Sequence, residues 1–204
     1  MDAPGDEYTT LASRAEAELT VRGSRFLALA VPVQDLAECE AELGARRKLR
    51  HDATHHCYAY RLGPGGGAWR ANDDGEPAGT AGKPILAVID GAGLSDVLVV
   101  VTRYFGGTKL GVGGLARAYR DAAAGAVQRG GRAAKLLSVI LDVEVTHDRV
   151  GPVMRAVAGA GGTLLSSRYD AEVLLSVRIR RSRLDGLRAS LLEATSGRAR
   201  LTPR

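Results

Sequence analysis

The sequence predicts an α+β fold in two domains, one over residues 1–133 and a smaller one over residues 134–204. Three observations support this prediction. The second half reads as strand, helix, strand, strand, helix, strand, which is the order of a ferredoxin-like module of about 70 residues. The stretch RGGRAAK at 129–135 has the composition of a linker. The wholly apolar run at 97–101, rich in β-branched residues, indicates a central strand covered on both faces.

Local patterns place the elements of the first domain. Strands are expected where β-branched and aromatic residues dominate, and turns where Gly, Pro, Asn and Asp cluster. Asp35 has the side chain of a helix cap, and Pro84 suits the first turn of a helix. The expected elements are a loose arm at 1–10, strands at 15–21, 25–31, 55–62, 68–71 and 97–101, helices at 36–50, 85–89 and 115–128, and a long loop at 72–84.

The second domain carries the positive charge of the chain. Its expected elements are strands at 138–145, 163–168, 171–179 and 198–202 and helices at 148–158 and 182–195. The net charge of +5 lies in residues 165–204, which hold nine arginines and four acidic residues, because residues 1–164 are neutral. A basic segment on a neutral body predicts an anionic partner such as RNA. The alternative is an arginine-rich surface that is merely solvated.

Composition predicts a cytoplasmic protein with no membrane partner. No run approaches the roughly 18 apolar residues of a membrane span. The acidic, polar start MDAPGDEYTT lacks the basic and apolar regions of a secretory signal. Cys39 and Cys57 are too few for a disulfide framework, which agrees with a reducing compartment.

The stretch VVVTRYFGGTKLGVGGLARAYR at 99–120 carries the most informative motif. It fails the Walker A pattern, because no Gly-Lys-Ser/Thr closes it, and it also fails the dinucleotide pattern G-x-G-x-x-G. A glycine-rich turn into a helix N-terminus still presents free N–H groups, which makes it a general anion site. The residues expected to hold the anion are Arg103, Gly106, Gly107, Lys109, Gly113, Gly114 and Arg117. The alternative is a tight strand–helix turn in which the glycines only permit close approach.

A second motif, NDDGEP, gathers Asp73, Asp74 and Glu76. Its register lacks the alternating acidic positions of an EF-hand, so a turn is favoured over a metal site. The carboxylates would brace the loop by accepting N–H groups or, in an enzyme, Asp74, Glu76 or His55 would act as acid or base. The spacing in HDATHHC at 51–57 suits neither a zinc site nor a nucleophile dyad, so no metal, cofactor or catalytic residue is assigned.

The basic tail contains one local pattern, VRIRRSR at 177–183. Arg178 and Arg180 are expected on one face of a strand, and Arg181 at the opening of the next helix. Phosphate contact through these arginines is one interpretation, and a solvated edge strand is the other.

Taken together, these motifs resemble the YigZ/IMPACT family. The resemblance rests on DATHHCYAYR, DDGEPAGTAGKPIL and VVVTRYFGGTKLGVGGLARAY, covers residues 20–130 strongly, and continues as the small C-terminal domain of bacterial two-domain members. It implies that the first domain is similar to the α/β sandwich of the second domain of ribosomal protein "S five". It implies that the second is similar to the ferredoxin-like domains of elongation factor G. Both scaffolds are associated with RNA or the ribosome, which is an analogy of fold.

Three hypotheses about function follow from the motifs and the resemblance. The first is a cytoplasmic, non-enzymatic protein that binds nucleic acid or the ribosome and takes part in the regulation of translation. The second is an enzyme that acts on a small phosphorylated ligand held by the glycine-rich loop. The third is a protein-binding adaptor in which that loop is structural. Salt-sensitive binding would favour the first, because each neutralised phosphate releases counterions.

Overall fold

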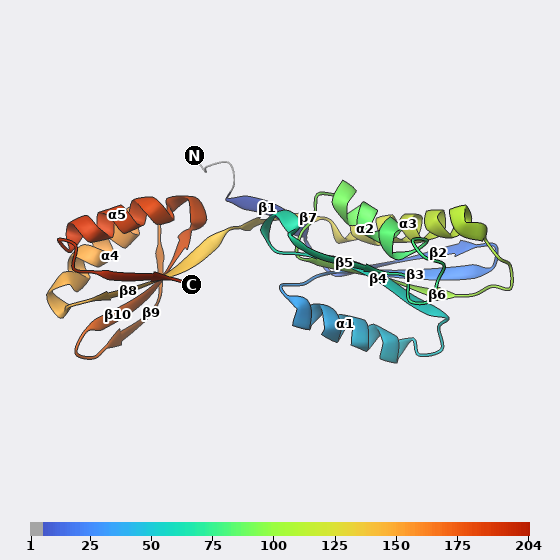
Figure 1. Ribbon diagram of the computed structural model, residues 1–204, viewed down its shortest axis with the longest axis horizontal. Coiled ribbons are helices and arrows are strands. Elements are labelled where there is room, and N and C mark those ends of the chain that lie inside the picture. Colours follow the sequence, from blue (N-terminus) through green and yellow to red (C-terminus); the bar gives the residue numbers. More distant parts are fainter. Residues whose placement is uncertain (1–5) are drawn as a thin grey trace. The chain divides into compact units, whose positions relative to one another are not determined.

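The computed structural model describes residues 6–204, which form two compact units (Figure 1). One unit comprises Tyr8–Lys135, and the other comprises Leu136–Arg204 together with Asp6 and Glu7. Both units mix helices and strands, so the predicted α+β class is confirmed. Among these residues, no helix is both long and apolar enough to cross a membrane.

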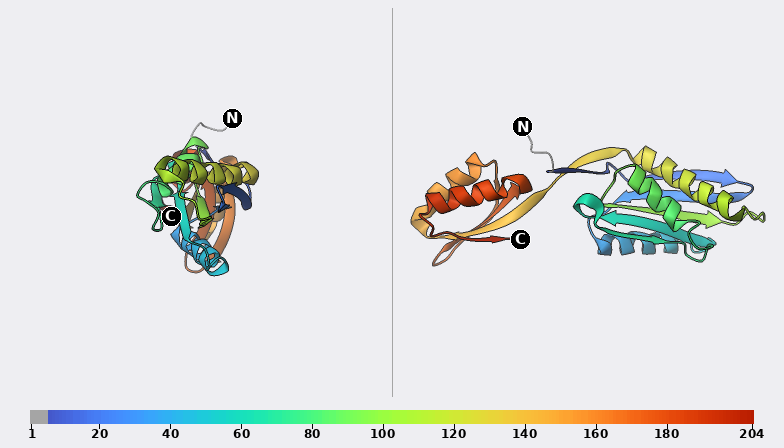
Figure 2. Two further views of the ribbon diagram at one scale, coloured as in Figure 1. Left: turned by 90° about the vertical axis from the view of Figure 1, so that its right-hand side faces the viewer. Right: turned by 45° about the horizontal axis from the view of Figure 1, so that its top comes forward.

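The larger unit is a five-stranded antiparallel sheet with helices on both faces (Figures 1 and 2). The strands lie in the order β2 (Ala15–Val21), β3 (Ser24–Pro32), β6 (Val97–Tyr104), β4 (His55–Leu62) and β5 (Ala68–Asn72). Helices α2 (Gly82–Gly91) and α3 (Gly111–Gly130) cover one face, α1 (Leu36–Leu49) covers the other, and the 3-10 helix η1 (Pro64–Gly66) connects β4 to β5.

Strand β6 is the central strand that its apolar run predicts. Its residues from Val97 to Arg103 are all buried. Val99 and Val101 pack in the core beneath α2 and α3, whereas Leu98 and Val100 pack in the core beneath α1. One strand supplies both cores because successive side chains point to opposite faces of a sheet. The loop that follows β6 is therefore anchored at the centre of the unit.

Two expectations for the ends of this unit are wrong. The arm expected at 1–10 contains strand β1 (Glu7–Leu11), while residues 1–5 lie outside the described residues. The linker expected at 129–135 contains most of strand β7 (Arg132–Leu136), which pairs with β1 in a two-stranded sheet. Each strand finds its partner at the opposite end of the unit's sequence, so local patterns do not reveal the pairing.

Two helices begin earlier than the sequence predicts. Helix α2 begins at Gly82 and α3 at Gly111, three and four residues before the expected starts. Glycine has low helix propensity, which hides the first turn of each helix from a pattern-based prediction. Gly113 and Gly114 therefore lie in the first turn of α3 and not in the loop before it.

The smaller unit has the strand order of a ferredoxin-like fold. The antiparallel strands are β11 (Arg200–Pro203), β8 (Ser138–Val145), β10 (Val173–Arg180) and β9 (Thr163–Tyr169). Helices α4 (Val150–Gly159) and α5 (Leu184–Ala194), preceded by the 3-10 helices η2 (His147–Arg149) and η3 (Arg181–Arg183), pack on one face of this sheet. The predicted order of strands and helices is confirmed.

Candidate functional site

The glycine-rich loop crosses the β2–β3 turn at backbone contact. A Cβ on Gly106 would lie 1.9 Å from the carbonyl carbon of Gly23, and a Cβ on Gly23 would lie 2.9 Å from the oxygen of Gly106. The Gly106 N–H donates to Ser24 Oγ at 3.1 Å, and the Phe105 N–H donates to Thr54 Oγ1 at 3.1 Å. Glycine is required at this crossing because no side chain fits, and the loop is held by the strands around it.

The residues after the crossing turn the chain into α3. Gly107 and Gly111 have φ angles of 85° and 71°, in the left-handed region that glycine adopts without strain. The helix begins after Leu110 without a hydrogen bond from a capping side chain. Its first N–H groups therefore lack such a partner, and they lie at the positive end of the helix dipole. This geometry suits an anion.

Three basic side chains surround the start of α3. Lys109 lies two residues before the helix, Arg117 lies on it, and Arg22 lies in the β2–β3 turn; all three are exposed. Arg22 and Arg117 line a cavity of about 200 Å³ whose wall also includes Leu110, Gly114 and Asp121, the last paired with Arg120. Within the described part of the chain, no carboxylate forms an ion pair with any of these three cations. Their charges are therefore available to a ligand.

Sequence reasoning missed two residues of this surface. Arg22 reaches it only because Gly23 crosses Gly106, a contact between distant segments that no local pattern signals. Phe105, which is 48% exposed, follows β6 directly and immediately precedes the Gly106 crossing. The sequence places Phe105 in the loop after the predicted strand at 97–101, where an aromatic side chain is a usable signal of a binding surface.

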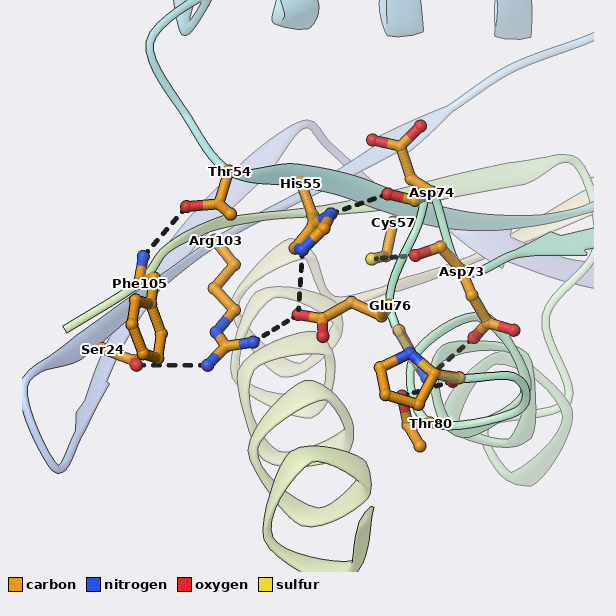
Figure 3. Close-up of polar contacts among 12 residues, drawn as sticks. Ser24, Thr54, His55, Cys57, Asp73, Asp74, Glu76, Thr80, Arg103 and Phe105 are labelled. Carbon is orange, nitrogen blue, oxygen red and sulfur yellow. Dashed lines mark hydrogen bonds and ion pairs between the residues drawn. The ribbon is translucent and has the colours of Figure 1, made fainter. Parts of the chain in front are cut away.

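Arg103 is corrected from a surface cation to a buried one. It continues the face of β6 that carries Val99 and Val101, so its side chain enters the core beneath α3. Its guanidinium donates to Glu76 Oε1 at 2.6 Å and to Ser24 Oγ at 3.4 Å. Its guanidinium carbon also lies 5.4 Å from the ring centroid of Phe105, and Figure 3 shows the two side chains next to each other.

Glu76 joins the NDDGEP loop to the glycine-rich loop. Besides Arg103, its carboxylate accepts the Tyr119 hydroxyl of α3 at 2.8 Å. His55 Nε2 lies 3.9 Å from the same oxygen, and its Nδ1–H donates to the Asp74 carbonyl at 2.7 Å. Figure 3 shows Arg103 and His55 converging on Glu76 beside β4 and β6. The acid predicted as a brace or as a catalytic group is thus enclosed by three protein partners.

The two aspartates organise their own loop. Asp73 accepts the N–H groups of Gly79, Ala81 and Gly82, at 2.8 to 2.9 Å, and so caps the start of α2. Although burial raises the pKa of the Asp73 carboxyl, these N–H groups hold it below its usual value. Asp74, at a φ of 44°, accepts the backbone N–H of His56 at 2.7 Å and a guanidinium N–H of Arg47 at 2.8 Å.

The cysteine beside this loop is not an activated nucleophile. The Cys57 thiol donates to the Asp73 carbonyl at 3.0 Å, and burial raises the pKa of Cys57 to about 12. A nucleophilic cysteine needs the opposite shift, because the thiolate is the reactive form. Within residues 6–204, no group of three or more His, Cys, Asp or Glu side chains is arranged to hold a metal ion.

The predicted arginines of the tail occupy the uncovered face of the smaller sheet. Val177 and Ile179 face the helices, so the alternate residues Arg178 and Arg180 point to the other side. Arg178 is exposed, Arg180 is half-buried, and Arg181 begins η3. On the same face, two further arginines are engaged with carboxylates: Arg200 with Glu144 and Arg204 with Asp142.

Two family models match the chain. The Impact N-terminal domain matches residues 22–127, which include the glycine-rich loop, the NDDGEP loop and the start of α3. A domain of unknown function, DUF1949, matches residues 143–198 of the smaller unit.

Curated relatives and a solved structure agree with these matches. "IMPACT family member YvyE" of Bacillus subtilis (strain 168) is 31% identical over 192 residues, which are 94% of this chain and 88% of the relative. "IMPACT family member in pol 5'region" of Thermus thermophilus is 47% identical over 133 residues, 65% of this chain and 71% of the relative. A crystal structure described as that of a hypothetical protein superposes with a TM-score of 0.75 at 29% identity, covering 96% of both chains.

Proposed function

We propose that this protein, which belongs to the IMPACT family, binds RNA, free or in the ribosome, and acts in the cytoplasm in the regulation of translation. The observation that carries the proposal is the start of α3. There, uncapped N–H groups lie among three exposed cations that have no carboxylate partner in the described chain. Such an arrangement holds a phosphate by hydrogen bonds and by charge.

The adjacent aromatic ring favours unpaired nucleotides over a regular duplex. Phe105 is half exposed, its backbone N–H is bonded to Thr54, and Arg103 supports its ring. A ring fixed in this way offers a face on which a splayed base stacks, while the neighbouring Lys109 takes the backbone phosphate. Stacking of this kind tolerates any base, so the expected binding has little sequence preference.

The state of the acidic residues supports a binding role over a catalytic one. Asp73, Asp74 and Glu76 each accept hydrogen bonds from two or more protein groups. An acid engaged in this way holds the loop in shape and is not free to take a proton from a ligand. The uncovered sheet face with Arg178 and Arg180 is proposed as a second phosphate contact.

The test is filter binding of single-stranded RNA, with co-sedimentation of ribosomes in parallel, over a series of salt concentrations. We expect binding to weaken steeply with salt. The double variant Lys109→Ala/Arg117→Ala should lower affinity and make the slope of log K against log salt shallower by about 1.4, roughly 0.7 for each lost phosphate contact.

A matched control is available on the same helix. Arg129 is exposed at the opposite end of α3 and donates to the Glu16 carbonyl, so Arg129→Ala should leave the slope unchanged. Binding of the double variant that equals wild type would remove the site assignment. The lack of any RNA or ribosome binding at low salt would remove the proposed function as a whole.

A further inference from the structure

A groove runs along the outer edge of the larger sheet, away from the glycine-rich loop. Strand β5 is the outermost strand of that sheet, and helix α2 lies beside it. Between them is a cavity of about 390 Å³ whose apolar lining is Trp69, Ala71, Leu86 and Ala87, with Lys83 and Asp90 at its rim. Trp69 is 57% exposed, an unusual position for so large an apolar side chain.

The groove is closed at one end by a glycine contact. A Cβ on Gly82 would lie 2.5 Å from the backbone nitrogen of Asn72, so the first turn of α2 sits directly on the end of β5. Near Trp69 the groove is lined by Leu86 and Asp90, which lie farther along α2. The helix and the strand edge therefore enclose a slot that is closed at Asn72 and lined by apolar side chains beyond it.

The two faces of β5 have different chemistry. Trp69 and Ala71 pair across the sheet with Arg61 and Ala59, on the face that α2 covers. Arg70 lies on the opposite face and is exposed. A strand added to the edge of β5 would likewise present its alternate side chains to an apolar slot and to a cation.

The net charge of this surface is positive, because Arg61, Arg70 and Lys83 outnumber Asp73 and Asp90. The Asp73 carboxylate is occupied by three N–H groups, and Asp90 pairs with Arg61. Lys83 and Arg70 are exposed, and in the described part of the chain neither forms an ion pair. A ligand that complements the groove must therefore combine apolar side chains with negative charge.

We propose that the edge of β5 and the groove beneath α2 form a binding site for an extended acidic peptide of another protein. The peptide adds as a sixth strand through the backbone groups that an edge strand leaves unpaired. Its sequence alternates apolar and acidic residues, with the apolar ones over Trp69 and Leu86 and the acidic ones beside Arg70. This site lies outside the proposed RNA surface and does not depend on it.

Charge argues against a second copy of this chain, and the need for backbone hydrogen bonds argues against a nucleic acid. If two copies of this chain paired β5 with β5 about a two-fold axis near the middle of the strand, Arg70 would face Arg70, and like charges directly opposite each other are destabilising. A nucleic acid could stack on Trp69. It has no repeating N–H and C=O groups at the spacing of about 3.3 Å per residue that a strand edge offers.

The chain carries its own reporter for the test, because Trp69 is its single tryptophan. The full-length protein is titrated with a pool of synthetic heptapeptides that alternate Glu or Asp with Leu, Val, Ile or Phe, and Trp69 emission is recorded. Burial of the indole should shift its emission to shorter wavelength. A second pool with Lys in place of the acids should give no shift.

Two further comparisons test the mode of binding. Arg70→Glu should weaken binding by roughly three- to tenfold, whereas Arg178→Glu, on the other unit, should not. In a peptide chosen from the active pool, N-methylation of alternate residues should abolish binding in one register and leave it nearly intact in the other, because a strand pairs through one edge only.

Each other outcome overturns the proposal. No response to the acidic pool would exclude the site, and equal response to both pools would exclude the charge argument. A Trp69 response to oligothymidylate and not to peptide would assign the groove to nucleic acid. A blue shift that grows with protein concentration alone would assign it to a second copy of the chain.

Discussion

Replacement of Glu76 by glutamine tests whether a buried ion pair holds the glycine-rich loop. Glu76 and Arg103 are 8% and 5% exposed, and Arg103 Nη1 lies 2.6 Å from Glu76 Oε1. Glutamine keeps the shape of the side chain and an acceptor oxygen for Arg103 and for the Tyr119 hydroxyl. It removes the negative charge, however, and leaves the buried guanidinium without compensation.

The size of the effect follows from these contacts. Removing one partner of a buried ion pair costs about 3–5 kcal/mol, and the retained amide oxygen recovers about 1 kcal/mol as a neutral acceptor. We therefore expect Glu76→Gln to lower the free energy of unfolding of the larger unit by about 2–4 kcal/mol. With a urea m-value of about 2 kcal/mol/M, the midpoint should fall by about 1–2 M.

The assay is urea unfolding followed by far-UV circular dichroism and by the fluorescence of Trp69, which lies in the larger unit. Glu40→Gln, an exposed acid on α1, is the control. A midpoint shift for Glu76→Gln no larger than that of the control would refute the reasoning. Under conditions where the variant is folded, RNA affinity should fall while the salt slope stays at the wild-type value, because Glu76 positions the site through Arg103 and touches no phosphate.

Other substitutions and conditions probe neighbouring contacts. Burial raises the pKa of Cys57 to about 12 and that of Cys39 to about 11, so neither thiol should react with iodoacetamide at neutral pH before urea unfolds the chain. Rapid alkylation of the native protein, detected by mass spectrometry, would contradict this. Burial also lowers the pKa of His56 below its usual value of 6.5, so protonation favours the unfolded state. The urea midpoint of wild type should therefore fall more steeply below about pH 6.5 than that of His56→Asn, and parallel curves would argue against the shift. Gly106→Ala should cost about 3 kcal/mol through the clash with Gly23. Gly44 lies in α1 with open space around it, so Gly44→Ala should instead raise the free energy of unfolding by about 0.5–1 kcal/mol. Equal urea midpoints for the two variants would contradict the glycine crossing.

Local chemistry explains why much of the fold was predictable. Asp35 accepts the Glu38 N–H at 2.9 Å at the start of α1, as its residue type predicts. The apolar run of β6 has the two-sided burial expected of a central strand. In both cases the information lies within one element, because capping and burial depend on residue type and period.

The parts that sequence reasoning missed depend on distant contacts. Periodicity alone puts Arg103 on the inward face of β6. Its positive charge nevertheless predicts an exposed side chain, because the sequence does not show that Glu76, in another loop, is its ion-pair partner. Arg22 was overlooked for the same kind of reason, since only the crossing of Gly23 and Gly106 brings its turn to the site. A buried charge is predictable only together with the group that compensates it.

The same contacts explain why the three motifs behind the family resemblance act as one structure. Asp74 holds the backbone of β4 at His56, Glu76 holds Arg103 of β6, and Arg103 supports the ring of Phe105. The acids of NDDGEP are therefore used inside the protein, and what the assembly presents outward is an aromatic ring, free N–H groups and cations. A surface that presents N–H donors and cations in this way has the chemistry of the anion-binding site that we propose above.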